Sequence, residues 1–164
     1  MIRETRPHVV ILPYWKGRHP DHYSASVLGY EACFLAGLKK LELGAQHSAV
    51  SQGSAGTNPI EQLAPHRPFK IIYATLYYDV RPTFVVDISD QFEGKFASIL
   101  AYKSQFSDQE AGKDLFPAHD EIRARVDAMA RFYGMLGGVT HAEPFLQKEV
   151  GLVEDLLSIP VKSI

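Results

Sequence analysis

The sequence predicts a mixed α/β fold, because apolar runs typical of strands alternate with stretches whose apolar residues recur at helical spacing. Residues 8–14 form a short apolar run bounded by prolines, which indicates a buried strand of a parallel sheet. Residues 22–41 then carry apolar side chains at helical spacing, and Lys39 and Lys40 favour the last turn of this helix. We therefore expect a strand, a short loop and a helix at the start of the chain.

The middle of the chain repeats this alternation. Residues 70–78 and 83–88 are dense in β-branched and aromatic side chains, which predicts two further strands. Ser89 or Asp90 is expected to cap a helix that runs to about Phe106. The order of these elements again favours strands that are covered by helices.

The last third adds one long helix and a short tail. The pattern predicts a helix over residues 120–135 that is stopped by Gly137 and Gly138. A short extended piece and a helical stretch over 150–157 follow. Residues 44–66 are rich in Gly, Ser, Ala, Gln and Pro without periodicity, so we expect a long loop there. Together these elements predict a single domain over residues 1–164 with a mostly parallel sheet flanked by helices.

Composition excludes several classes of protein. The chain has 164 residues, 46% of them apolar, and a net charge of −2 that is spread thinly, so we expect one soluble domain with no binding to nucleic acid or to an anionic membrane. The single Cys33 excludes a disulfide framework and favours a reducing compartment. No apolar run approaches a membrane span or a signal peptide, and we expect a cytoplasmic protein.

The segment from Arg18 to His22 concentrates polar chemistry between the first strand and the first helix. In open α/β sheets, ligands bind beyond the carboxyl ends of strands, which is where this segment is expected. Pro20 suits the first helical position, so His19 and His22 would lie on neighbouring faces of the helix start. Imidazole is a preferred zinc ligand, and the Asp21 carboxylate can orient a histidine. From these residues alone, a functional site and a solvent-exposed helix cap both remain open.

Several segments resemble the LmbE-like (PIG-L) zinc N-deacetylases, and most of all their bacillithiol-biosynthesis branch. Members of that branch remove acetate from N-acetylglucosaminyl-malate. The resemblance is carried, in the order of the chain, by residues 6–14, 18–22, 84–89, 100–106, 130–134 and 141–145. It implies the C-terminal part of a Rossmann-like fold and a substrate that is a small N-acetyl amino-sugar conjugate. Because related enzymes assemble into oligomers, it also implies a homo-oligomer.

The resemblance further implies roles for the first segment. His22 would be a ligand of Zn²⁺, and His19 would stabilise the oxyanion or act as general acid, with Asp21 tuning it. Arg18 and Tyr14 would line the substrate pocket. In such a site zinc polarises the acetamide carbonyl and lowers the pKa of its bound water, which suits amide hydrolysis.

Three later residues are weaker candidates. Gln105 is expected near the end of a helix, where a polar contact to substrate competes with simple exposure. Arg131 can reach an anionic group such as malate, although an exposed helical arginine is the commoner case. His141 is the best alternative metal ligand because the resemblance places its segment close to the pocket. Solvent exposure or a local hydrogen bond is its other interpretation.

One family segment has no counterpart in the sequence. Family members begin with a strand that leads into Ala-His-Pro-Asp-Asp, which supplies two further zinc ligands and the general base. We therefore expect a truncated deacetylase whose zinc site is incomplete. The alternative, of another class, is a non-catalytic binding or assembly module that retains the distal half of the deacetylase pocket.

Overall fold

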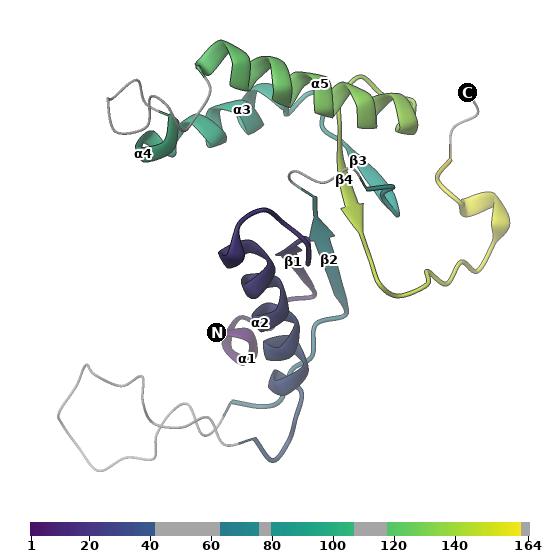
Figure 1. Cartoon of the computed structure of the whole chain (residues 1–164). Helices are drawn as coiled ribbons and strands as arrows, with labels where there is room; N and C mark the ends of the chain where they lie inside the picture. Colours follow the sequence, from purple (N-terminus) through teal and green to yellow (C-terminus); the bar gives the residue numbers. More distant parts are fainter. Residues whose placement is uncertain (42–62, 76–79, 107–117, 162–164) are drawn as a thin grey trace. The chain divides into compact units, whose positions relative to one another are not determined.

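The computed structural model describes four stretches of the chain, residues 1–41, 63–75, 80–106 and 118–161 (Figure 1). These residues divide into two compact units, which we call the first unit (Met1–Asp79) and the second unit (Val80–Ile164). Each unit pairs two strands with helices, which confirms the predicted α/β class. Most of the expected 44–66 loop lies outside the described residues.

The first unit is a strand-helix-strand unit with one additional short helix. Its elements are α1 (Ile2–Thr5), β1 (Val9–Pro13), α2 (Pro20–Ala36) and β2 (Lys70–Ala74). Strands β1 and β2 run parallel, in a register that places Val9 opposite Lys70 and Pro13 opposite Ala74. The predicted parallel pairing is therefore confirmed for these two strands. Tyr77 and Tyr78, which were expected to extend β2, lie outside the described residues.

Helix α2 packs on one face of β1. A Cβ atom at Gly29 of α2 would overlap the side chain of Leu12 in β1, so the absence of a side chain at Gly29 allows the close approach. Leu12 is buried there, and so is Cys33 of α2. Val9 and Ile11, which alternate with the inward positions of β1, remain 45% and 59% exposed. The predicted burial of this strand is wrong for these two residues, because α2 covers the opposite face of β1.

The other end of α2 is fixed by an arginine from α1. The side chain of Arg3 is buried, and it donates hydrogen bonds to the carbonyl oxygens of Ala36 at 3.0 Å and Leu38 at 2.6 Å. A cation at these carbonyl groups complements the negative end of the helix dipole. The helix therefore ends at Ala36, with Gly37 as its C-cap, and not at Leu41 as predicted.

The second unit contains an antiparallel strand pair with a long helix against it. Its elements are β3 (Phe84–Asp87), α3 (Phe92–Leu100), α4 (Lys103–Phe106), α5 (His119–Gly137), β4 (Ala142–Leu146) and the 3₁₀ turn η3 (Leu156–Ser158). Strand β3 pairs with β4, with Phe84 opposite Phe145 and their rings stacked at 5.7 Å. This pair departs from the mostly parallel sheet that was predicted.

The core of the second unit forms where α3 and α5 meet. Ile88, Phe92 and Ala130 are buried together, with Val126 packed against them. Phe96 is also buried, one turn further along α3. The predicted end of α5 is confirmed, because Gly138 caps the helix with a φ of 67° that suits glycine.

Three boundary predictions in this unit were wrong. Gln91, and not Ser89 or Asp90, occupies the N-cap of α3, because the Ser89 hydroxyl donates to the Asp87 carboxylate instead. The helix ends at Leu100, and the separate turn of α4 follows. The helix expected over 150–157 is reduced to η3, whose apolar side chains Leu156 and Leu157 are exposed.

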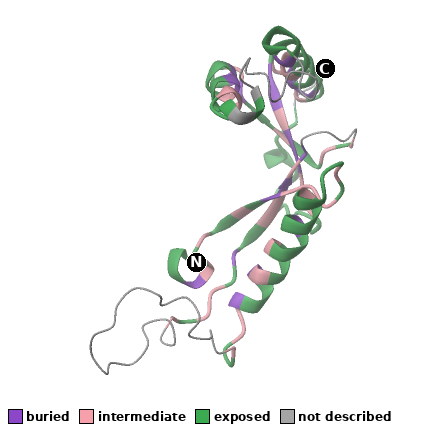
Figure 2. Ribbon diagram, turned by 60° about the vertical axis from the view of Figure 1, so that its left-hand side comes forward, coloured by how far each residue is buried: buried purple, intermediate pink, exposed green. Residues whose placement is uncertain are grey.

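Exposure is uneven along α2 (Figure 2). Six of its large apolar side chains are at least 40% exposed, namely Tyr23, Val27, Leu28, Tyr30, Phe34 and Leu35. Among the described residues, no helix is long and apolar enough to cross a membrane.

Candidate functional site

The candidate site lies where β1 ends and α2 begins. The carboxyl ends of β1 and β2 share one edge, because the strands are parallel. The backbone N–H of Tyr14 donates to the carbonyl of Ala74 at 3.0 Å, which carries the pairing one residue past β1. The chain then leads through residues 15–18 into α2, with His19 as N-cap and Pro20 as the first helical residue. The predicted position of the segment is confirmed.

His19 has a defined role in the helix start. Its Nδ1 accepts a hydrogen bond from the backbone N–H of Asp21 at 3.2 Å. An accepting Nδ1 carries no proton, so the neutral ring holds its proton on Nε2. The Asp21 carboxylate lies 3.7 Å from the same Nδ1, and both side chains are largely exposed. A proton on Nδ1 of His19 would therefore lie beside the Asp21 carboxylate.

His22 lies beside His19 on the first turn of α2. The two imidazole rings are 5.5 Å apart between centroids, and the N–H of His22 donates to the carbonyl of His19 at 3.1 Å. Gly17 in the preceding loop lies close to His22, because a Cβ atom added to Gly17 would be 3.7 Å from the Cβ of His22. His22 is half-buried, whereas His19 is exposed. The two rings thus lie on neighbouring faces of the helix start, as the spacing predicted, and a shared ligand stays a prediction.

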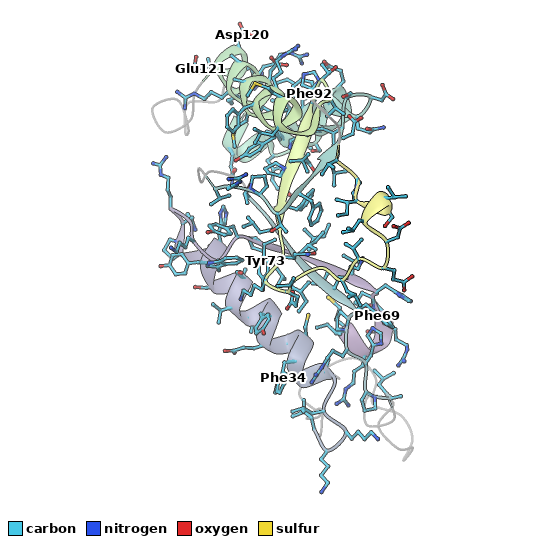
Figure 3. All side chains as sticks on the ribbon, turned by 90° about the vertical axis from the view of Figure 1, so that its right-hand side faces the viewer. Phe34, Phe69, Tyr73, Phe92, Asp120 and Glu121 are labelled. Carbon is cyan, nitrogen blue, oxygen red and sulfur yellow. The ribbon has the colours of Figure 1, made fainter. Side chains whose placement is uncertain are left out.

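Aromatic side chains border this segment. Tyr14 and Trp15 are half-buried, and their rings are tilted against each other at 4.4 Å between centroids. Trp15 also meets Tyr73 of β2 at 4.7 Å in a T-shaped contact. Tyr73, labelled in Figure 3, is almost fully buried. Arg18 is exposed, so its predicted contact with substrate stays a prediction.

A catalytic zinc ion is normally held by three protein ligands. The described residues contain no group of three His, Cys, Asp or Glu side chains that could hold a metal ion together. His22 and its neighbours therefore do not by themselves fit a complete zinc centre.

The two later substrate candidates lie in the second unit. Gln105 is exposed in α4. The Nε of Arg131 donates to the Asp127 carboxylate at 2.8 Å, one turn earlier in α5. Arg131 therefore already has an anionic partner within its own helix. Substrate contacts by either residue stay predictions.

A contact between the buried His141 and the half-buried Asp127 in the second unit was not predicted from the sequence. The Nε2 of His141 lies 3.0 Å from an oxygen of Asp127, and its ring stacks on Phe92 at 4.4 Å. The hydrogen bond from Arg131 lowers the pKa of the Asp127 carboxyl, and the hydrogen bond from His141 adds a smaller effect in the same direction. His141 thus makes the local hydrogen bond that was the alternative to metal binding. Its partner lies 14 residues earlier in the chain, a spacing that matches no short motif.

Known proteins were compared with this chain, and no family model matches it. Diacetylchitobiose deacetylase from Thermococcus kodakarensis is 29% identical over 147 residues, which cover 87% of this chain. A second relative, 1D-myo-inositol 2-acetamido-2-deoxy-alpha-D-glucopyranoside deacetylase from Mycobacteroides abscessus, is 28% identical over 70% of this chain. The homologues of this chain thus include deacetylases named for two different N-acetyl amino sugars.

A solved structure agrees in fold. The crystal structure of the conserved protein TT1542 from Thermus thermophilus is similar with a TM-score of 0.66 and 32% identity over 93% of this chain. The chain spans 46% and 42% of the length of the two deacetylases and 57% of the Thermus chain. The similarity therefore concerns about half of each of these proteins.

Proposed function

We propose that this chain is part of an LmbE-like N-deacetylase that hydrolyses the N-acetyl group of an amino-sugar conjugate. N-acetylglucosaminyl-malate, the substrate of the bacillithiol branch, is the candidate that the sequence resemblance suggests. The observation that carries the proposal is the His19–His22 pair at the carboxyl end of β1, in a chain whose homologues are sugar deacetylases. The proposal includes a cytoplasmic homo-oligomer that acts on a small molecule.

The reaction requires proton transfers that this segment is suited to support. Water adds to the acetamide carbon, the C–N bond breaks, and the departing amine takes up a proton while acetate is released. His19 is proposed as the acid that gives this proton, through the exposed side of its ring. When Nδ1 is protonated, it no longer accepts from the backbone of Asp21 and instead faces the Asp21 carboxylate. Asp21 is thus proposed to stabilise the charged form of His19.

His22 is proposed as one ligand of a zinc ion. Its imidazole is half-buried beside His19, which fits a ligand that is held in place and not free in solvent. Because the described residues supply no set of three ligands, the remaining ligands are not assigned. Arg18 and Tyr14, which flank the histidines, are proposed to contact the substrate.

The test is to measure free amine released from N-acetylglucosaminyl-malate and from N,N′-diacetylchitobiose. Both the 164-residue chain and the longest reading frame that contains it should be assayed, with bound zinc measured in each. Where activity is found, His19→Ala should lower kcat by about 10²–10⁴, the usual contribution of a general acid. His22→Ala should lower both activity and bound zinc.

His119→Ala is the matched control, because His119 is exposed at the start of α5. It should retain activity and zinc. Release of amine that is unaffected by either His19→Ala or His22→Ala would refute the assignment. Absence of release from both proteins, when they are folded and supplied with zinc, would refute the function itself.

An assembly module is the second candidate, and the exposed apolar surface of α2 favours it. Val27, Tyr30 and Phe34 are neighbours at helical spacing and are 53%, 41% and 53% exposed, and contiguous apolar surface of this kind marks contact sites between polypeptides. A module of this type would bind a protein partner through α2 and release no amine. Amine release distinguishes the two candidates, because only the deacetylase produces free amine, whereas self-association is compatible with both.

A further inference from the structure

Trp15 is the only tryptophan of the chain, and it lies two residues after the end of β1 at the candidate site. Its indole ring is half-buried, with Tyr14 on one side and Tyr73 of β2 on another. Tyr73 is only 1% exposed. A ring held by two aromatic neighbours has little freedom left, so binding a ligand to its solvent-exposed part costs little side-chain entropy.

The loop that follows Trp15 approaches the histidines through Gly17. Gly17, two residues after Trp15, is in contact range of His22, and His19 follows two residues later at the N-cap of α2. Gly17 therefore lies against the first turn of α2, and Trp15 is two residues away along the chain. A ligand that reaches the imidazoles of His19 and His22 can extend along this segment towards the indole ring.

A polar group at the same edge has no partner among the described residues. The hydroxyl of Thr75, the residue after β2, is buried without a hydrogen bond in the described part of the chain. Since β1 and β2 are parallel, Thr75 and Trp15 follow strands that end at one edge. A buried hydroxyl without a partner costs about 1–3 kcal/mol, so this edge favours ligands that bring hydrogen-bonding groups.

We propose that the indole ring of Trp15 is the stacking surface for the sugar ring of the substrate. A pyranose ring presents C–H groups on its faces and hydroxyl groups at its rim, which matches a fixed aromatic ring that is bordered by polar side chains. Arg18 and His19 supply those polar groups. The proposal rests on the deacetylase function above and adds the residue that recognises the sugar. With the ring stacked on Trp15, the acetamide group is directed towards the two histidines.

The test uses the emission of Trp15, which is unambiguous because no other tryptophan contributes. The full chain is titrated with N,N′-diacetylchitobiose, and separately with acetamide, which carries the acetyl group without a sugar ring. A saturable change in emission with the sugar and none with acetamide is expected. Sugar binding detected by saturation-transfer NMR without a change in emission would overturn the proposal, and so would the absence of any binding.

Variants separate stacking from a packing role. Trp15→Leu should raise the Kd for the sugar about tenfold, which corresponds to the upper range of an aromatic stacking contact. Trp15→Phe, which retains a ring, should recover most of this loss. Phe132→Leu is the control, because Phe132 is an exposed aromatic residue of α5, and it should leave the Kd unchanged. Thermal unfolding of each variant shows whether it is folded.

The outcomes also separate this proposal from the proposed function. If Trp15→Leu raises KM about tenfold with little change in kcat, uniform binding of the sugar has been lost, as expected. Amine release with a KM and Kd that do not depend on Trp15 would overturn the stacking role and leave the deacetylase function intact. Sugar binding that depends on Trp15 without amine release would support stacking and refute the hydrolysis.

Discussion

Replacing Arg3 with methionine is expected to destabilise the first unit by about 3 kcal/mol. The guanidinium group makes two short hydrogen bonds, to the carbonyl oxygens of Ala36 at 3.0 Å and Leu38 at 2.6 Å. Hydrogen bonds to a charged group contribute about 1.5–3 kcal/mol each, and we use the lower value because solvent reaches part of the group. The contacts to Leu41 and Leu63, both at 3.4 Å, are too long to add much. Methionine keeps the apolar stem of the side chain and removes these bonds.

The assay is urea unfolding followed by the emission of Trp15, which lies in the same unit as Arg3. The unfolding midpoint should fall while the slope m stays constant. Arg6→Met is the matched control, because Arg6 is exposed and makes one contact of 3.5 Å to Ala64. Its effect should stay within about 0.5 kcal/mol. An Arg3→Met variant with the midpoint of the control would refute the role of Arg3 at the end of α2.

Two further predictions concern the second unit. The hydrogen bond from Arg131 holds the pKa of Asp127 below its ordinary range. The ionised carboxylate therefore stabilises the fold at pH values above the ordinary aspartate pKa. This stabilisation is lost as the pH falls through the lower pKa of the folded state. Asp127→Asn should therefore be less stable than the parent at neutral pH and approach it below about pH 4; a constant difference down to pH 2 in acid unfolding would contradict this. Gly134→Ala should destabilise the protein, because the added Cβ in α5 would lie 2.6 Å from a backbone oxygen. The control is Gly94→Ala in α3, whose added Cβ meets nothing within 4 Å. This variant should be more stable than the parent by about 0.5–1 kcal/mol. Equal melting temperatures for the two glycine variants would show that this crowding is relieved by local movement.

The sequence alone determined the order of the elements and the place of the candidate site. Hydrophobic spacing is a local property, and it located β1, α2 and α5 to within a few residues. The stop at Gly138 was predictable because glycine readily adopts the positive φ that the C-cap requires. The position of His19 and Pro20 at the start of α2 followed from the same local rules.

Only the tertiary structure decided which groups meet across the chain. Arg3 reaches Ala36, which is 33 residues away, and this contact ended α2 earlier than its apolar pattern indicated. His141 meets Asp127 because β4 lies against α5, and Trp15 meets Tyr73 because β1 and β2 pair in parallel. These contacts depend on strand pairing and helix packing between segments far apart in sequence, which local patterns of residues do not encode.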